Sequence, residues 1–227
     1  MLKQRFPILL AALALLLFVA PMVRAFGSQS HTALGNGVVA VALLAVLVAA
    51  LFAVRAGRRL HPIDFAITIP TLILQFVSAA IDSNLVLAIH HVFTALFLGY
   101  IVVAILRMVF STRRVTFDTI SASLCVYVLL GILWAVAYSL LELASPGSFS
   151  FSFIEAQEAA PLMCLSAETA VYPLYFSFVT LTTLGYGDIV PHSSPVRMAA
   201  TFEALTGQLY LVVLVARLVA LHISESD

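Results

Sequence analysis

Long runs of hydrophobic residues alternate with short polar stretches along almost the whole chain. Six of these runs approach or exceed the length of about 20 residues that a helix needs to cross a bilayer. They cover residues 6–26, 37–54, 63–81, 85–106, 120–141 and 196–222. A shorter apolar run at 172–182 would form a helix roughly 16 Å long, about half a membrane. The pattern predicts an all-α membrane protein with six transmembrane helices and a short re-entrant helix between the fifth and sixth.

Composition supports a membrane protein and narrows the function. Hydrophobic residues make up 63% of the chain and charged residues 10%, which is more apolar than a soluble core requires. The zero net charge argues against a nucleic acid partner. Because the chain shows no nucleophile–base pattern, metal-ligand spacing or phosphate loop, we expect neither an enzyme nor a cofactor. Cys125 and Cys164 are too few for a disulfide framework and are expected to be free thiols.

The first apolar run leaves two interpretations open. Lys3 and Arg5 precede it, and Val23-Arg24-Ala25 follows near its end, which is typical of a cleaved signal peptide at residues 1–25. Its length also fits a retained transmembrane helix, which is the interpretation we favour.

Basic residues fall mainly on one side of the predicted helices. That side carries Lys3, Arg5, Arg55, Arg58, Arg59, Arg107, Arg113 and Arg114. The other side carries only Arg24 and Arg197, and Arg217 lies near the inner end of the last helix. Because cytoplasmic loops are rich in Lys and Arg, we expect both termini in the cytoplasm and the loop before the last helix outside.

Residues 180–188, directly after the short apolar run, read Thr-Leu-Thr-Thr-Leu-Gly-Tyr-Gly-Asp. Gly185 and Gly187 flank Tyr186, so every second residue can adopt backbone angles that a Cβ disfavours. Consecutive carbonyls can then face one narrow axis and replace the water around a cation. Asp188 would stand just outside, where a carboxylate raises the local cation concentration.

This stretch resembles the selectivity filter of the potassium channel family, whose pattern is Thr-x-Gly-Tyr-Gly-Asp. The chain as a whole resembles a prokaryotic-type subunit of that family. The resemblance covers about residues 115–222 and is strong from 172 to 190. It implies that K⁺ is the permeant ion and that four identical subunits surround one pore, since each chain holds one filter. The filter residues it implies are Thr183, Leu184, Gly185, Tyr186 and Gly187, with K⁺ at the first four, and Thr182 and Asp188 beside them.

The last helix carries further candidates for pore function. Glu203 is a carboxylate at membrane depth, where such residues are expensive and usually functional; we expect it to support the filter rather than touch the ion. Gly207 is expected to be the hinge of the inner helix, with close helix packing as the alternative. One face of this helix is expected to line the cavity, with plain lipid contact as its alternative: Gln208, Leu211, Val215 and Val219.

The fourth helix lacks the features of a voltage sensor. Residues 85–106 contain no Arg or Lys, and Arg107 stands at the inner end, so we expect no intrinsic voltage gating. His90 and His91 allow a proton sensor, although hydrogen-bonded residues within the bundle are the favoured interpretation.

These observations predict two parts of the chain. Residues 1–114 would form a four-helix membrane domain of unknown role, and residues 115–227 a pore domain with outer helix, pore helix, filter and inner helix. The expected protein is a K⁺-selective, homotetrameric, multi-pass channel subunit in the lipid bilayer of a cell membrane, with the bacterial inner membrane as the expected location. The alternatives are a potassium-uptake transporter-like subunit, which carries four degenerate filter loops in one chain, and a non-conducting accessory channel subunit.

Overall fold

A computed structural model describes residues 5–26, 62–81, 83–112, 115–153, 160–165 and 169–224 of the 227-residue chain. Its α-helices are α1 (Arg5–Phe26), α3 (Pro62–Ala80), α4 (Asn84–Ser111), α5 (Phe117–Ala144), α7 (Val171–Leu181) and α8 (Ser194–Ser224). A 3-10 helix η2 (Ala160–Met163) and the strands β1 (Phe149–Phe151) and β2 (Ile189–Pro191) complete these elements. The predicted helix at 37–54 lies outside the described residues.

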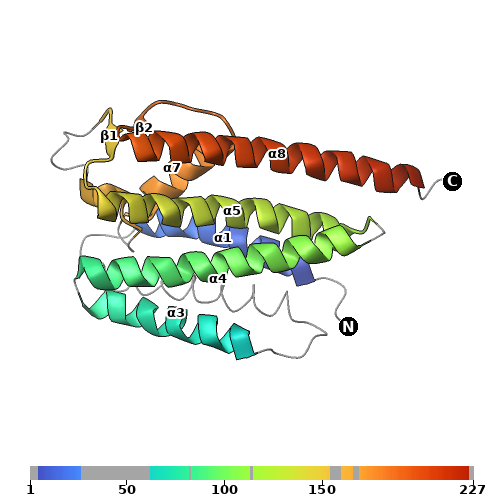
Figure 1. Cartoon of the computed structure of the whole chain (residues 1–227), viewed down its shortest axis with the longest axis horizontal. Helices are drawn as coiled ribbons and strands as arrows, with labels where there is room; N and C mark the ends of the chain where they lie inside the picture. Colours follow the sequence, from blue (N-terminus) through green and yellow to red (C-terminus); the bar gives the residue numbers. More distant parts are fainter. Residues whose placement is uncertain are drawn as a thin grey trace.

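The long helices form an elongated bundle in which α5 is central (Figure 1). α5 packs against α1, α4, α7 and α8, whereas α3 packs against α4. The start of α1 and the end of α8 lie at one end of the bundle, and the two strands lie at the opposite end (Figure 1). This arrangement places α7 and α8 on one side of α5, and α3 and α4 on the other.

Local sequence signals explain where several helices begin. Thr116 precedes α5, and its hydroxyl accepts a hydrogen bond from the Thr119 amide over 3.2 Å, as an N-cap residue does. α8 begins with Ser194 and Pro195, and proline is favoured in the first turn because its missing N–H has no intrahelical partner there. These ends lie within a few residues of those predicted from hydrophobicity.

The segment between α5 and α7 contains a short strand. β1 pairs antiparallel with β2, which follows the glycine-rich stretch, so that Ser150 lies opposite Val190. Phe149 and Phe151 point to the buried side of β1, while Ser150 is exposed. The fold is therefore helical with a small two-stranded ribbon that ties the loop before α7 to the segment after the glycine-rich stretch.

Two apolar cores hold the bundle together. The larger joins α1, α4 and α5 and includes Leu9, Ile101 and Leu129. The smaller is aromatic and lies beside the ribbon, where Tyr138, Phe149 and Phe176 contact one another edge to face at centroid distances between 4.9 and 5.7 Å. Such geometry is the favoured one for aromatic pairs, and here it fixes α7 against α5 and β1.

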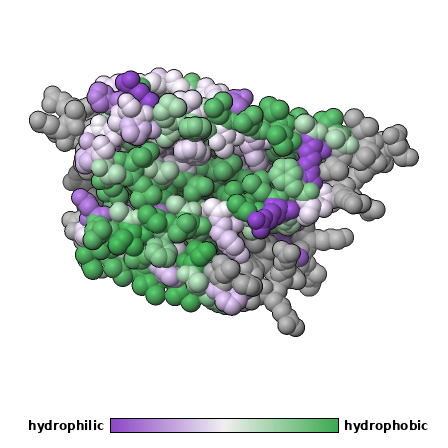
Figure 2. Space-filling model, viewed as in Figure 1, coloured by the Kyte–Doolittle hydropathy of each residue, from purple (hydrophilic) through white to green (hydrophobic). Residues whose placement is uncertain are grey.

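Three of the described helices are long and apolar enough to cross a membrane. They are Asn84–Ser111, Phe117–Ala144 and the Ser194–Ala220 part of α8. Within the same described ranges, the shorter apolar stretches include Arg5–Leu15, Asp64–Ser78 and Val171–Leu181. Hydrophobic residues cover most of the face in Figure 2, and hydrophilic residues gather mainly toward the ends of the bundle. These features indicate a helical membrane protein.

Candidate functional site: the loop between α7 and β2

The helix α7 leads into the glycine-rich stretch. Its buried residues include Pro173, Phe176, Ser177 and Leu181, whose spacing of three and four places them on one helical face. That face packs on α5 and α8. With 11 residues, α7 is roughly 16 Å long and too short to cross a bilayer. Its C-terminal end, which carries a partial negative charge, lies directly before the loop.

The backbone of the loop alternates between two conformations. φ is positive at Thr183 (59°), Gly185 (59°) and Gly187 (80°), and at no other non-glycine residue described. Glycine adopts this region freely, but for a β-branched threonine it is a rare conformation. Because Leu184 and Tyr186 lie between these residues without positive φ, every second residue is left-handed. Such an alternation lets successive carbonyls face one side, which an extended strand does not allow.

Hydrogen bonds to α7 hold the first half of the loop. The carbonyl of Val179 accepts from the amides of Leu184 (2.9 Å) and Gly185 (3.4 Å), and the Thr183 amide donates to Thr180 O over 2.9 Å. The side chain of Thr183 is also fixed, because Gln208 Nε2 on α8 donates to its Oγ1 over 3.3 Å. Thr182 turns its hydroxyl back to Phe178 O at 2.5 Å. These bonds stabilise the strained conformation at Thr183.

The C-terminal end of the loop is held by Tyr175 and Asp188. The Tyr175 hydroxyl donates to Asp188 Oδ2 over 2.7 Å, and the Ile189 amide donates to Oδ1 over 3.0 Å. The rings of Tyr175 and Tyr186 are stacked, 6.4 Å apart and inclined by 5°. Asp188 O accepts from the Ser152 amide over 2.9 Å, which connects the loop to the ribbon. Tyr175 therefore braces the loop through both its hydroxyl and its ring.

Glu203 lies behind α7 and is fully buried. Tyr138 on α5 donates to its Oε2, and Ser177 on α7 donates to its Oε1, each over 2.5 Å. The Ser177 hydroxyl also lies 2.7 Å from the carbonyl of Gly131 on α5. One hydroxyl proton cannot serve both acceptors, whereas a proton on the Glu203 carboxyl would satisfy the whole set. The carboxyl joins the three helices α5, α7 and α8 around the loop.

Two glycines permit close packing around α7. A Cβ at Gly207 would lie 2.3 Å from Leu181 O, and one at Gly131 would lie 2.6 Å from the Phe178 ring. Both distances are far below van der Waals contact. The Leu181 carbonyl also faces the Tyr127 hydroxyl at 3.4 Å. Gly207 thus has a packing requirement in this structure, in addition to the hinge role expected from the sequence.

One face of α8 is exposed within the described chain, although Gln208 on this face reaches Thr183. The sequence-predicted cavity residues Gln208, Leu211, Val215 and Val219 are all exposed. Leu184 and Tyr186 in the loop are also exposed, by 60% and 67%. Apolar exposure of this kind in a membrane protein requires lipid, another subunit or a water-filled cavity beside it.

The structure brings most of the sequence-predicted residues together. Thr182 to Asp188 form one loop, Gln208 contacts that loop, and Glu203 and Gly207 pack behind α7. Sequence reasoning expected Glu203 to bond to hydroxyls of the short helix or to backbone amides, and Ser177 on α7 is such a hydroxyl. It did not identify Tyr138 as a partner of Glu203, or Tyr175 as the partner of Asp188. A hydroxyl in an apolar helix requires a hydrogen-bond acceptor, so each of these residues could be expected to form a hydrogen bond. The sequence alone does not show which residue accepts it.

Comparison with known proteins agrees with a channel. Residues 149–223, about a third of the chain, match the family model Ion_trans_2, described as "Ion channel". No curated protein matches the chain, and no solved structure matches it. The match begins at β1 and ends in α8, so it contains α7, the loop and Glu203. These findings support ion channel function in a membrane protein, carried by the C-terminal part of the chain.

Proposed function

We propose that the protein is a potassium-selective channel subunit and that the loop from Thr183 to Gly187 is its selectivity filter. The observation that carries the proposal is the alternation of φ at Thr183, Gly185 and Gly187. A filter that replaces the hydration shell of K⁺ requires consecutive backbone carbonyls on one axis, and this alternation supplies the backbone geometry. Carbonyls of Thr183 to Tyr186 would bind the ion, with the Thr183 hydroxyl at the inner end.

Four copies of the chain would form the pore. One chain holds one loop, and closed rings of identical subunits are the common form of homo-oligomers. The exposure of Leu184, Tyr186 and the apolar side of α8 fits a surface that meets other subunits or the ion pathway. α7 would be re-entrant, its C-terminal end directing partial negative charge toward the ion.

The remaining helices complete the proposed topology. With the predicted segment at 37–54, the chain would cross the membrane six times, both termini being cytoplasmic and the loop external. Eight basic residues on the inner side against two on the outer side support this orientation. The cell membrane, and for a prokaryotic-type channel the bacterial inner membrane, is the proposed location.

Ion flux from liposomes tests the proposal. Vesicles that contain the purified protein and are loaded with K⁺ should discharge when a protonophore balances the charge, whereas Na⁺-loaded vesicles should not. Native mass spectrometry of the same preparation should show tetramers. Equal fluxes of the two ions, or a monomer as the largest conducting species, would contradict the proposal.

A further inference from the structure

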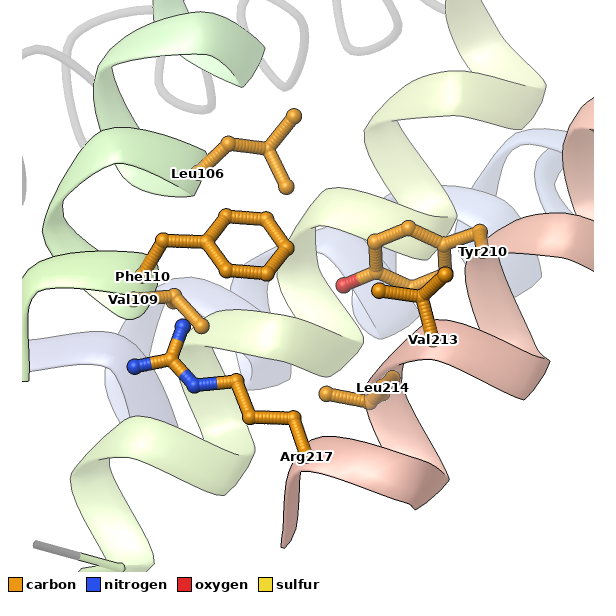
Figure 3. Close-up of a pocket in the computed structure, with 7 residues that line it drawn as sticks. All are labelled: Leu106, Val109, Phe110, Tyr210, Val213, Leu214 and Arg217. Atoms are coloured by element: carbon orange, nitrogen blue, oxygen red, sulfur yellow. The ribbon is translucent and has the colours of Figure 1, made fainter.

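A small cleft is lined by residues of α4 and α8, toward the end of the bundle opposite the two strands (Figure 1). The empty space of about 260 Å³ includes the open mouth of the cleft, and its interior has room for little more than one water molecule. Apolar and aromatic side chains form most of its wall, and one arginine closes it (Figure 3). The lining residues are Leu106, Val109, Phe110, Tyr210, Val213, Leu214 and Arg217.

The guanidinium of Arg217 forms some of the hydrogen bonds that it can donate, but not all of them. Its Nη2 donates to Thr112 O over 2.7 Å, and its Cζ lies 4.8 Å from the centre of the Phe110 ring. Its Nη1 is buried and has no acceptor among the described residues. An unsatisfied buried donor is costly, most of all on a charged group, so Nη1 calls for an anionic oxygen that enters the cleft.

The sequence that follows α4 is rich in arginine. Thr112 is followed by Arg113 and Arg114, and Arg107 precedes it in α4. Basic pockets between transmembrane helices on the cytoplasmic side are suited to anionic lipid headgroups. The Tyr210 hydroxyl is already engaged, since it donates to Ser123 O over 2.6 Å, and leaves its ring as part of the apolar wall.

We propose that this cleft binds one anionic phospholipid per subunit. A phosphate oxygen accepts a hydrogen bond from Arg217 Nη1, and an acyl chain lies along Leu106, Val109 and Val213. A phosphodiester with attached hydrocarbon satisfies both the charged and the apolar parts of the wall, whereas free phosphate satisfies only the first. The binding step does not depend on which ion the pore conducts.

The position of the cleft gives the lipid a bridging role. Tyr210, Leu214 and Arg217 recur at four and three residues and share one face of α8. Gln208, Leu211 and Val215, the proposed cavity residues, lie on another. A lipid held by Arg217 therefore contacts α4 and α8 from outside the pore, and it would connect the N-terminal helices to the inner end of α8.

Lipid retention measured by native mass spectrometry tests the site. The full-length protein in detergent is titrated with dioleoyl phosphatidylglycerol or with dioleoyl phosphatidylcholine, which has the same chains and no net charge. We expect phosphatidylglycerol to be retained more strongly, up to one molecule per subunit. Arg217→Gln should weaken its retention by about tenfold to a hundredfold, the range for one charged hydrogen bond. Arg197→Gln, an exposed arginine at the other end of α8, should leave retention unchanged.

One further variant and a competition experiment with soluble anions also test the site. Val213→Trp keeps Arg217 but fills the apolar wall, and it should also reduce retention; it therefore tests the site even if Arg217→Gln does not fold. Inorganic phosphate and glycerol phosphate should not displace the lipid at equal concentration. Equal retention of the two lipids, unchanged retention in both variants, or displacement by the soluble anions would overturn the proposal.

Discussion

Ser177 on α7 donates its hydroxyl to the Glu203 carboxyl on α8 over 2.5 Å, in a position where Glu203 is fully buried. Tyr138 on α5 completes the set from the opposite oxygen. The three side chains form a polar bridge directly behind the loop. Removing any of them leaves a hydroxyl or a carboxyl unsatisfied in apolar surroundings, where each such group costs about 1–3 kcal/mol.

We predict that Glu203→Gln is tolerated and that Glu203→Val is not. The Gln carbonyl can accept from Tyr138, and its amide can donate to Ser177, which then donates to Gly131 O. Valine leaves the Tyr138 hydroxyl without an acceptor. Thermal stability of the proposed tetramer, followed by its loss on native gels, should fall much more for Val than for Gln. Equal behaviour of both variants and the parent would refute a structural role for Glu203.

Gly207→Ala separates packing from hinge motion. The added methyl would lie 2.3 Å from Leu181 O, so the end of α7 must shift, at roughly 1–3 kcal/mol for overpacking. We expect lower thermal stability and faster amide exchange at the end of α7. Gly99→Ala in α4 is the control, because nothing lies within 4 Å of its Cβ and alanine favours a helix by up to about 1 kcal/mol. If both variants are equally stable, the close approach of Gly207 to Leu181 does not contribute to the stability of the fold.

Tyr175→Phe should loosen the C-terminal end of the loop. The substitution keeps the ring beside Tyr186 and removes the hydroxyl that Asp188 accepts, a bond worth about 1.5–3 kcal/mol when the acceptor is charged. Hydrogen exchange at residues 187–189 should quicken. Tyr172→Phe on the same helix, whose ring contacts Phe151 and Phe153, should leave this exchange unchanged. An unchanged loop in Tyr175→Phe would mean that ring stacking alone braces it.

We also predict only shallow voltage dependence. α4 spans 28 residues, and its only Arg or Lys is Arg107, near its C-terminal end. One charge that crosses the membrane contributes about 2.3 kcal/mol per 100 mV, and steep gating needs three or four per subunit. Open probability between about −100 and +100 mV should therefore change by less than one gating charge per subunit would give. A steep sigmoidal conductance curve in symmetrical K⁺ would contradict this.

Hydrophobicity predicted the helices well because each apolar run in a membrane protein must form a helix. The described helices, from α1 to α8, begin and end within a few residues of the predicted runs. The pairing of β1 with β2 could not be predicted, since Phe149–Phe151 is too short to show a periodic pattern and its partner lies 38 residues or more further along the chain. Strand pairing depends on which segments the helices bring together.

The backbone conformation of the loop could be predicted only in part from the sequence. Positive φ could be expected at Gly185 and Gly187, because glycine adopts it freely. It could not be expected at Thr183, where hydrogen bonds to Thr180 and Gln208 hold the left-handed backbone in place. Tyr175 was missed because its partner Asp188 is 13 residues away, and only the turn of the chain after α7 brings the two together.

The reversal potential with K⁺ on one side of a planar bilayer and Na⁺ on the other measures selectivity most directly. It should be made for the parent protein, for Gly185→Ala and for Gly147→Ala. Gly147, in the turn before β1, also has a positive φ (83°), and an added Cβ would meet no atom within 4 Å there. Both variants therefore carry a similar backbone strain of about 1–2 kcal/mol. The parent and Gly147→Ala should show a reversal potential close to that of a K⁺ electrode, and Gly185→Ala should lose selective current. A parent reversal potential near zero, or the same selectivity in all three proteins, would contradict a filter built on the alternating backbone of residues 183–187.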